Sequence, residues 1–213
     1  MVYFVSGTDT DIGKSIATGF LARRFADAGR RVITQKLVQT GCEKMSEDII
    51  THRKIMGIDL LPEDISGETC AYVFKYPASP HLSAQMENAE IDPAKIAAKT
   101  ELLRSRYDVV LLEGAGGLAV PLSRNFTTLD YICKYSLPLY LVVSSKLGGL
   151  NHALLSLEAC LRRNVFIAGV VYNMYPAAPQ PIERSTADYI RAYLAKHSPE
   201  TQFIEMGRVD YGK

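Results

Sequence analysis

A glycine-containing loop close to the N-terminus limits the folds that this chain can adopt. The loop, Gly7-Thr8-Asp9-Thr10-Asp11-Ile12-Gly13-Lys14-Ser15, follows a run of β-forming residues at Val2–Ser6 and precedes a helical pattern over Ile16–Ala28. A strand, a loop that ends in Gly-Lys-Ser and a helix start together form a P-loop, in which backbone N–H groups and the helix dipole bind phosphate. The chain is therefore predicted to begin with a phosphate-binding βα unit.

The spacing within this loop departs from the usual pattern. Five residues separate Gly7 from Gly13, where four are common, and Thr8 stands where the first glycine is usual. The alternative interpretation is a chance Gly-Lys-Ser that only begins a helix, but its position directly after a strand favours the phosphate loop. We expect nucleotide contacts from this loop and the helix start, with Lys14 on the β- and γ-phosphates, Ser15 on Mg²⁺, and backbone contacts from Ile12, Gly13 and Ile16.

Beyond the loop, short apolar runs alternate with helical patterns. Strands are predicted at Val32–Gln35, Ala71–Phe74, Val109–Leu112, Leu139–Ser144 and Val165–Tyr172, and helices at Asp48–Met56, Pro93–Arg106, Asn151–Arg163 and Ile182–His197. Such alternation indicates βαβ units with right-handed crossovers. We predict an α/β fold, a mostly parallel sheet flanked by helices on both faces, similar to P-loop NTPases. The 213 residues suit a single domain over 1–213.

Charge and cysteine content narrow the function classes. The formal net charge is +1, so no whole-chain field favours nucleic acid or an anionic membrane, and we expect neither as a partner. Apolar runs are shorter than a membrane helix, and the N-terminus lacks the pattern of a signal peptide. The four cysteines show no paired spacing. We expect a cytoplasmic protein with reduced thiols.

Charged residues follow two more predicted strands, where a parallel sheet binds its ligands. Lys36 ends the strand at 32–35 and could face the phosphates or lie in solvent at the sheet edge; the residues alone leave both open. Glu113 follows the strand at 109–112. A carboxylate there can hold Mg²⁺ opposite a phosphate loop, so we favour a metal site over an exposed acidic turn. The small residues after it allow a nucleotide to approach the backbone: Gly114, Ala115 and Gly116.

Asp48 and Asn173 are ambiguous on the sequence alone. Asp48 lies at a helix start, where an acid complements the helix dipole, and this interpretation is favoured over metal binding. Asn173 follows the last predicted strand, where its amide suits the edge of a nucleobase, but asparagine is also a common turn residue. The four histidines have no metal-ligand spacing and no nucleophile partner, so none is assigned proton transfer.

Taken together, these motifs resemble the dethiobiotin synthetase family over most of the chain. The family's phosphate loop has the same five-residue gap, so the unusual spacing supports the match. The resemblance rests on the loop at 7–15, Lys36 with Thr40-Gly41, Asp48, Ser79-Pro80-His81, Glu113-Gly114-Ala115-Gly116-Gly117 with Pro121-Leu122, Lys146-Leu147-Gly148 with Asn151-His152-Ala153, and Asn173.

The resemblance implies a ligase that consumes a nucleoside triphosphate, ATP, with Mg²⁺. Its other substrates would be 7,8-diaminononanoate and CO₂ or bicarbonate, joined through a carbamic-phosphoric anhydride into a ureido ring in biotin biosynthesis. By the same resemblance Lys14 and Lys36 are catalytic, and Ser15, Asp48 and Glu113 hold the metal. It also implies nucleotide contacts at Thr10, Asp11 and Asn173, diamine contacts at Thr40, Gly149, Leu150 and Asn151, and a homodimer whose partner contributes Tyr189.

The C-terminus departs from the family pattern, and two other protein classes are alternatives to this family. The family usually continues past its last strand with a proline-containing loop that contacts the base and then a helix, whereas Glu205–Lys213 has neither, which predicts weak base selectivity. The main alternative is a partition or septum-positioning ATPase; such proteins carry a lysine five residues before Lys14, where this chain has Asp9. The other is a carboxylate-activating relative with a glutamine-hydrolysing domain, for which 213 residues leave no room.

Overall fold

A six-stranded parallel sheet forms the centre of the computed structural model, which describes residues 1–212; Lys213, the last residue of the predicted C-terminal tail, lies outside them. The strand order is β10–β9–β8–β1–β5–β2, and every neighbouring pair is parallel. These strands are β1 (Val2–Gly7), β2 (Val32–Lys36), β5 (Val109–Gly117), β8 (Leu139–Ser144), β9 (Ile167–Asn173) and β10 (Gln202–Met206).

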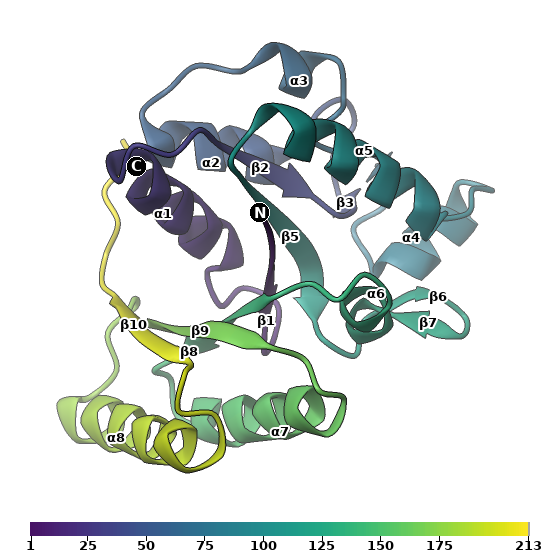
Figure 1. Ribbon diagram of the computed structural model, residues 1–213. Coiled ribbons are helices and arrows are strands. Elements are labelled where there is room, and N and C mark those ends of the chain that lie inside the picture. The colour runs from purple at the N-terminus through teal and green to yellow at the C-terminus, as the bar shows by residue number, and fades with distance from the viewer. Residues whose placement is uncertain (213) are drawn as a thin grey trace.

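Helices cover both faces of this sheet (Figure 1). One face carries α1 (Lys14–Asp27) and α2 (Glu47–Met56), which pack against each other. The opposite face carries α5 (Pro93–Arg106), α6 (Thr128–Lys134), α7 (Gly149–Arg162) and α8 (Gln180–His197). The predicted fold class is therefore confirmed.

Successive side chains of β1 pack alternately against the helices on the two faces of the sheet. Phe4 of β1 packs in the cluster that contains Leu157 of α7, while its neighbour Val5 packs in the cluster that contains Leu21 of α1. All four side chains are almost completely buried. A strand that is apolar on both faces is typical of a covered parallel sheet, and its burial fixes the carboxyl ends of β1, β2 and β5 relative to one another.

Several predicted elements differ from those observed. β5 extends to Gly117, so Glu113 lies within the strand rather than after it, paired in register with Lys36. The short strand predicted at Ala71–Phe74 is present but reduced to β4 (Val73–Phe74), and it pairs with β3 (Gln39–Thr40) outside the main sheet. Short elements without a readable period were not predicted: α3 (Pro62–Ile65), α4 (Pro80–Met86), β6 (Pro121–Ser123), β7 (Phe126–Thr127), α6 and β10.

The described residues after β10, 207–212, contain no helix. They run beside α1 (Figure 1), and Val209 packs against the apolar cluster on that face. Among the described residues, no helix has the length and apolar character needed to cross a membrane.

Candidate active site

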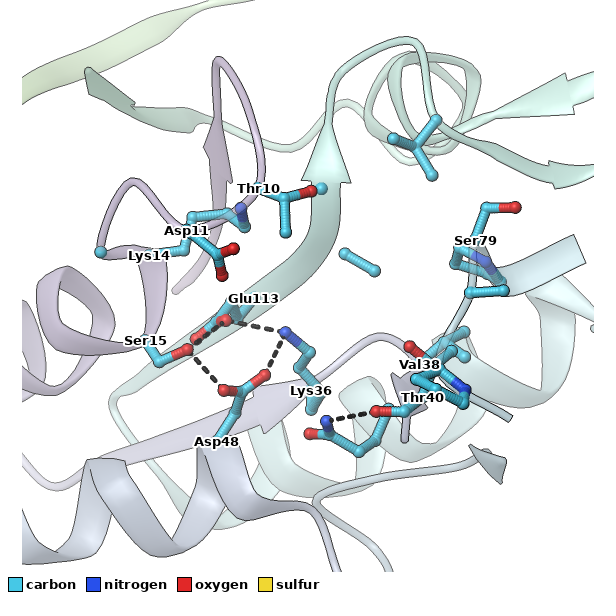
Figure 2. A pocket seen from close by; sticks show the side chains of 18 of the residues that line it. Thr10, Asp11, Lys14, Ser15, Lys36, Val38, Thr40, Asp48, Ser79 and Glu113 are labelled. Atoms are coloured by element: carbon cyan, nitrogen blue, oxygen red, sulfur yellow. Dashed lines mark hydrogen bonds and ion pairs between the residues drawn. The ribbon is translucent and has the colours of Figure 1, made fainter. Parts of the chain in front are cut away.

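The carboxyl ends of three neighbouring strands bring the predicted site residues together. β1 leads into the phosphate loop and α1, β2 ends at Lys36, and β5 contributes Glu113. The first turn of α2 adds Asp48 from the side. Figure 2 shows these side chains turned toward one another, although they come from four separate segments of the chain.

Four of these side chains form one hydrogen-bonded cluster. The Ser15 hydroxyl lies 2.5 Å from Asp48 Oδ1 and 3.0 Å from Glu113 Oε1. Lys36 Nζ lies 2.5 Å from Asp48 Oδ2 and 2.8 Å from Glu113 Oε1, and also donates to the Gly114 carbonyl at 3.0 Å. One ammonium thus bridges two carboxylates at the end of the phosphate loop (Figure 2). Lys36 therefore lies in the site and not in solvent at the sheet edge.

The charges in this cluster stabilise one another against burial. Burial alone would raise the pKa of Glu113, but Lys36 and His52 outweigh it and hold that pKa well below its usual range. For Lys36, burial opposes the charged form, but Glu113 and Asp48 outweigh it and raise its pKa above the ordinary lysine value. Both residues are therefore charged in the buried site, where an ion pair is weakly screened by solvent.

The orientation of Asp48 follows from the way α2 begins. Ser46 caps the helix, and its hydroxyl accepts from the Ile49 N–H at 3.2 Å. Because Ser46 performs the capping, the carboxylate of Asp48 is available to Ser15 and Lys36. The sequence favoured a helix-start role for Asp48; the structure places its carboxylate in the cluster as well.

The side chain of Lys14 is hydrogen-bonded to the backbone of the phosphate loop. Its Nζ donates to the Asp9 carbonyl at 2.6 Å, across the loop. Burial lowers the pKa of Lys14, opposed by Glu113 and reinforced by Lys36. Gly13, the N-cap residue directly before α1, has a φ of 87°, and a Cβ there would lie 2.6 Å from Asn173 Nδ2. Only glycine fits this position without strain.

A cleft of about 810 Å³ opens above the cluster. Most of the residues predicted to bind nucleotide or substrate line it: Thr10, Asp11, Gly13, Lys14, Ser15, Ile16, Lys36, Thr40, Asp48, Glu113, Ala115 and Gly116. The cleft is also lined by Val38, Gln39, Val120 and the segment Pro77–Pro80, to none of which the sequence assigned a site role. The prolines of that segment mark a loop, but their sequence carries no sign of which cleft the loop faces.

Other predicted residues lie outside this cleft. Asn173 lies behind the phosphate loop, where its Nδ2 donates to the Ile12 carbonyl at 2.9 Å and its Oδ1 accepts from the Tyr175 N–H at 3.0 Å. These bonds leave one amide hydrogen and one lone pair for another partner. Ile12 and Gly114 are buried beside the cleft, and the backbone of Gly114 packs against Phe4.

Three of the residues predicted to contact the diamine lie at the start of α7. Gly149, Leu150 and Asn151 form its first turn, and a Cβ at Gly149 would lie 2.3 Å from the Ser144 carbonyl. Tyr189 lies on α8 with 55% of its surface exposed. None of these residues lines the cleft within the described chain.

The sequence missed one residue that touches the cluster. His52, one helical turn after Asp48 on α2, places its Nε2 2.6 Å from Glu113 Oε2. The four-residue spacing from Asp48 to His52 was the available signal, because residues four apart share a helix face. Without knowledge of which strand α2 covers, that spacing could not name the partner.

The oxygen donors of the cluster suit magnesium. Ser15, Asp48 and Glu113 supply a hydroxyl and two carboxylates within hydrogen-bond distance of one another. Mg²⁺ prefers oxygen ligands and is commonly held by one or two carboxylates together with substrate phosphates. The bridging ammonium of Lys36 shows that this position already accommodates a positive charge.

Comparison with known proteins identifies the family. The chain is 54% identical over 207 residues to the ATP-dependent dethiobiotin synthetase BioD 2 of Haemophilus ducreyi, covering 97% of this chain and 98% of that protein. The chain belongs to the dethiobiotin synthetase family. It is also 51% identical to the ATP-dependent dethiobiotin synthetase BioD of Chlorobaculum tepidum, over 92% of this chain and 82% of the relative. The predicted family and the predicted ligase class are thereby confirmed.

More distant comparisons agree on the fold. A family described as an AAA domain matches residues 1–206. Among solved structures, a pNOB8 ParA bound to nonspecific DNA is similar with a TM-score of 0.57 at 16% identity, covering 94% of this chain and 78% of that one. A MinC:MinD complex from Aquifex aeolicus gives a TM-score of 0.55 at 11% identity, covering 96% and 81%. At such identities the likeness concerns the P-loop sheet alone.

Proposed function

We propose that this protein carboxylates 7,8-diaminononanoate and closes the ureido ring of dethiobiotin with consumption of Mg-ATP. The observation that carries the proposal is the cluster in which Lys36 bridges Asp48 and Glu113 directly beside the phosphate loop. This reaction must bring two anions together, a carbamate and the γ-phosphate of ATP. A buried site with two lysines and a magnesium position meets that requirement.

Each side chain has a defined part in binding. Lys14 and the backbone of the phosphate loop hold the triphosphate, and Ser15, Asp48 and Glu113 hold Mg²⁺. Bound there, the metal neutralises phosphate charge and orients the triphosphate. Lys36, beside both carboxylates, faces the space in which the carbamate and the γ-phosphate would meet.

The proposed reaction proceeds in three balanced steps. One amine of the diamine attacks CO₂, forms an N–C bond and loses a proton to give a carbamate. A carbamate oxygen then attacks the γ-phosphorus, and the bond from that phosphorus to ADP breaks. Finally the second amine attacks the carbamoyl carbon and the bond from that carbon to the phosphate oxygen breaks. The amine gives up one proton, which leaves with the departing phosphate as the ring closes. Lys36 stabilises the negative charge on the carbamate and the phosphate in the second and third steps. Thr40, which lines the cleft, contacts the diamine. The chain contributes positioning and electrostatic stabilisation, as is usual for phosphoryl transfer.

The proposal includes a homodimer in which the partner subunit completes the diamine site. Tyr189 on α8 has 55% of its surface exposed, and Leu155 on the neighbouring α7 has 62%. Leu147, just before α7, has 81% exposed. Large exposed apolar side chains near Gly149–Asn151 are consistent with an interface at this end of the molecule. Sedimentation equilibrium at micromolar concentration tests this part of the proposal.

A nucleotide-switching partition ATPase is less consistent with the site. At the position where those proteins carry a second lysine, this chain has Asp9, which forms a half-exposed ion pair with Lys146 at 3.5 Å. A carboxylate there would repel the phosphates of a partner's nucleotide.

The decisive experiment measures, in one reaction, the incorporation of labelled bicarbonate into product and the release of phosphate from ATP. The protein is incubated with ATP, Mg²⁺, labelled bicarbonate and the diamine, and acid-stable label is compared with released phosphate. A carbamate loses its label in acid, whereas a ureido ring retains it. We expect equal amounts of both products, and none without diamine. Phosphate release that DNA stimulates and the diamine does not would instead support a partition ATPase.

A further inference from the structure

A buried histidine contacts the carboxylate of Glu113 through the oxygen that does not face Lys36 and Ser15. His52 lies on α2 and is completely buried, as is Glu113. Its Nε2 is 2.6 Å from Glu113 Oε2, while the other carboxylate oxygen, Oε1, faces Lys36 and Ser15 in the cleft (Figure 2). The two oxygens of one carboxylate therefore have separate environments.

The hydrogen bonds on the other side of the His52 ring indicate which of its nitrogens carries the hydrogen. Arg53 Nη1 donates to Thr34 Oγ1 at 2.9 Å, and Thr34 Oγ1 lies 3.0 Å from His52 Nδ1. An ionised carboxylate only accepts, so the Nε2 of His52 must carry a hydrogen. With the Thr34 hydroxyl donating to Nδ1, every member of the series from Arg53 through Thr34 and His52 to Glu113 is satisfied.

This series is anchored at its far end. Arg53 donates to both oxygens of Asp64 at 2.8 Å, and Asp64 Oδ1 also accepts from Thr69 at 2.8 Å. All three side chains are buried. A two-point bond between guanidinium and carboxylate fixes the plane of the arginine, so Arg53 can hold Thr34 and His52 in one orientation.

We propose that His52 is a positioning residue that reserves Oε2 of Glu113 and leaves Oε1 as its single oxygen for Mg²⁺. The inference rests on the proposed magnesium site. Mg²⁺ demands near-ideal octahedral geometry, so a carboxylate free to turn would bind it less well. Partners behind metal ligands commonly change metal affinity ten- to hundredfold when they are removed.

Two conservative variants of His52 distinguish the hydrogen bond at Nε2 from the hydrogen bond at Nδ1. His52→Gln places an amide nitrogen near the position of Nε2 and can still donate to Glu113. His52→Asn places its amide near the position of Nδ1, where it reaches Thr34 but not the carboxylate. Both variants remain polar and both lose one of the two bonds. A role limited to filling the core would affect them alike.

The test measures Mn²⁺ binding by electron paramagnetic resonance in the presence of a non-hydrolysable ATP analogue, together with the Mg²⁺ concentration for half-maximal turnover. We expect His52→Asn to weaken Mn²⁺ binding about tenfold or more and His52→Gln to remain within about threefold of the wild type. Thr100→Val is the matched control, because it removes a buried hydrogen bond to Gln35 on the opposite face of the sheet. It should reduce thermal stability and leave Mn²⁺ binding unchanged.

Equal metal binding by the two His52 variants would overturn the inference. The same holds if Thr100→Val weakens binding as much as His52→Asn. A failure of the proposed function is distinguishable, because the wild type would then show no diamine-dependent turnover at any Mg²⁺ concentration. If His52→Asn does not fold, His52→Gln remains informative: Mn²⁺ affinity within threefold of the wild type supports the inference, and a tenfold loss refutes it.

Discussion

Glu113→Gln tests how the buried charges depend on one another. Glu113 is completely buried and accepts from Lys36 at 2.8 Å, from Ser15 at 3.0 Å and from His52 at 2.6 Å. Glutamine keeps the shape but has only one oxygen. Its NH₂ group must therefore face either Lys36, which only donates, or His52.

The less costly orientation turns the amide nitrogen toward His52. His52 would then accept at Nε2 and donate from Nδ1 to Thr34, which already accepts from Arg53. The hydrogen of Thr34 loses its acceptor in this arrangement. Lys36 keeps an acceptor in the glutamine oxygen and keeps its ion pair with Asp48.

The magnitude follows from these losses. Removing one partner of a buried ion pair typically costs about 3–5 kcal/mol. Lys36 retains Asp48, and a neutral amide is easier to bury than a carboxylate, so we expect about 2–3 kcal/mol of lost stability in metal-free protein. The variant should still fold, because a typical domain has about 5–15 kcal/mol of stability.

The assay combines urea unfolding in EDTA with a Mg²⁺ titration of turnover. We expect a lower urea midpoint with an unchanged slope, and an increase of about tenfold or more in the Mg²⁺ concentration that the reaction requires. Stability within 1 kcal/mol of the wild type would show that the cluster is less tightly coupled than its distances indicate. An unchanged Mg²⁺ requirement would show that Glu113 does not bind the metal.

Three further predictions concern other parts of the chain. Lys14→Ala should lower kcat/KM for ATP by about a thousandfold or more, or ~4 kcal/mol, because it removes a charge from the phosphate site; a loss under tenfold in steady-state kinetics would contradict the phosphate-loop assignment. Rates with ATP, GTP and CTP should agree within about tenfold, since Asn173 is the one base-contacting residue we predict; a preference for ATP above about a hundredfold, ~2.7 kcal/mol, would reveal an unassigned base pocket. Hydrogen bonds from Thr127 and the charge of Arg163 lower the pKa of Asp130 to about 2. Because the folded pKa lies below the unfolded value near 3.9, Asp130 stabilises the protein above pH ~4, and this contribution is lost as pH falls toward 2. Asp130→Asn should therefore cost on the order of 1 kcal/mol at pH 6, after allowance for solvent screening, and most of the difference from wild type in thermal unfolding should be gone at pH 2. A difference that stays constant across this range would exclude the charge of Asp130 as its source.

Much of the fold was readable from local patterns. The loop at 7–15, the apolar strands and the intervening helices each carry a signal within a few residues, and a parallel α/β sheet follows from their alternation. Because strand ends in such a sheet converge at one edge, the sequence favoured a metal site for Glu113 and offered the phosphate site as one of two possibilities for Lys36. The short elements α3, α4 and β10 were missed because a few residues show no period, and the tertiary structure alone orders them.

Local motifs in the sequence are enough to predict the phosphate loop and an acidic residue near it, whereas the interactions among the buried side chains depend on the folded structure. Asp48 reads as a helix-start acid until Ser46 is seen to cap α2 and Ser15 to contact the carboxylate. His52 carries no signal for Glu113, from which it is separated by 61 residues. Helical periodicity gives the face on which a side chain lies, whereas the strand beneath that face depends on long-range packing. The partners of buried charges are therefore fixed only when the chain closes around them.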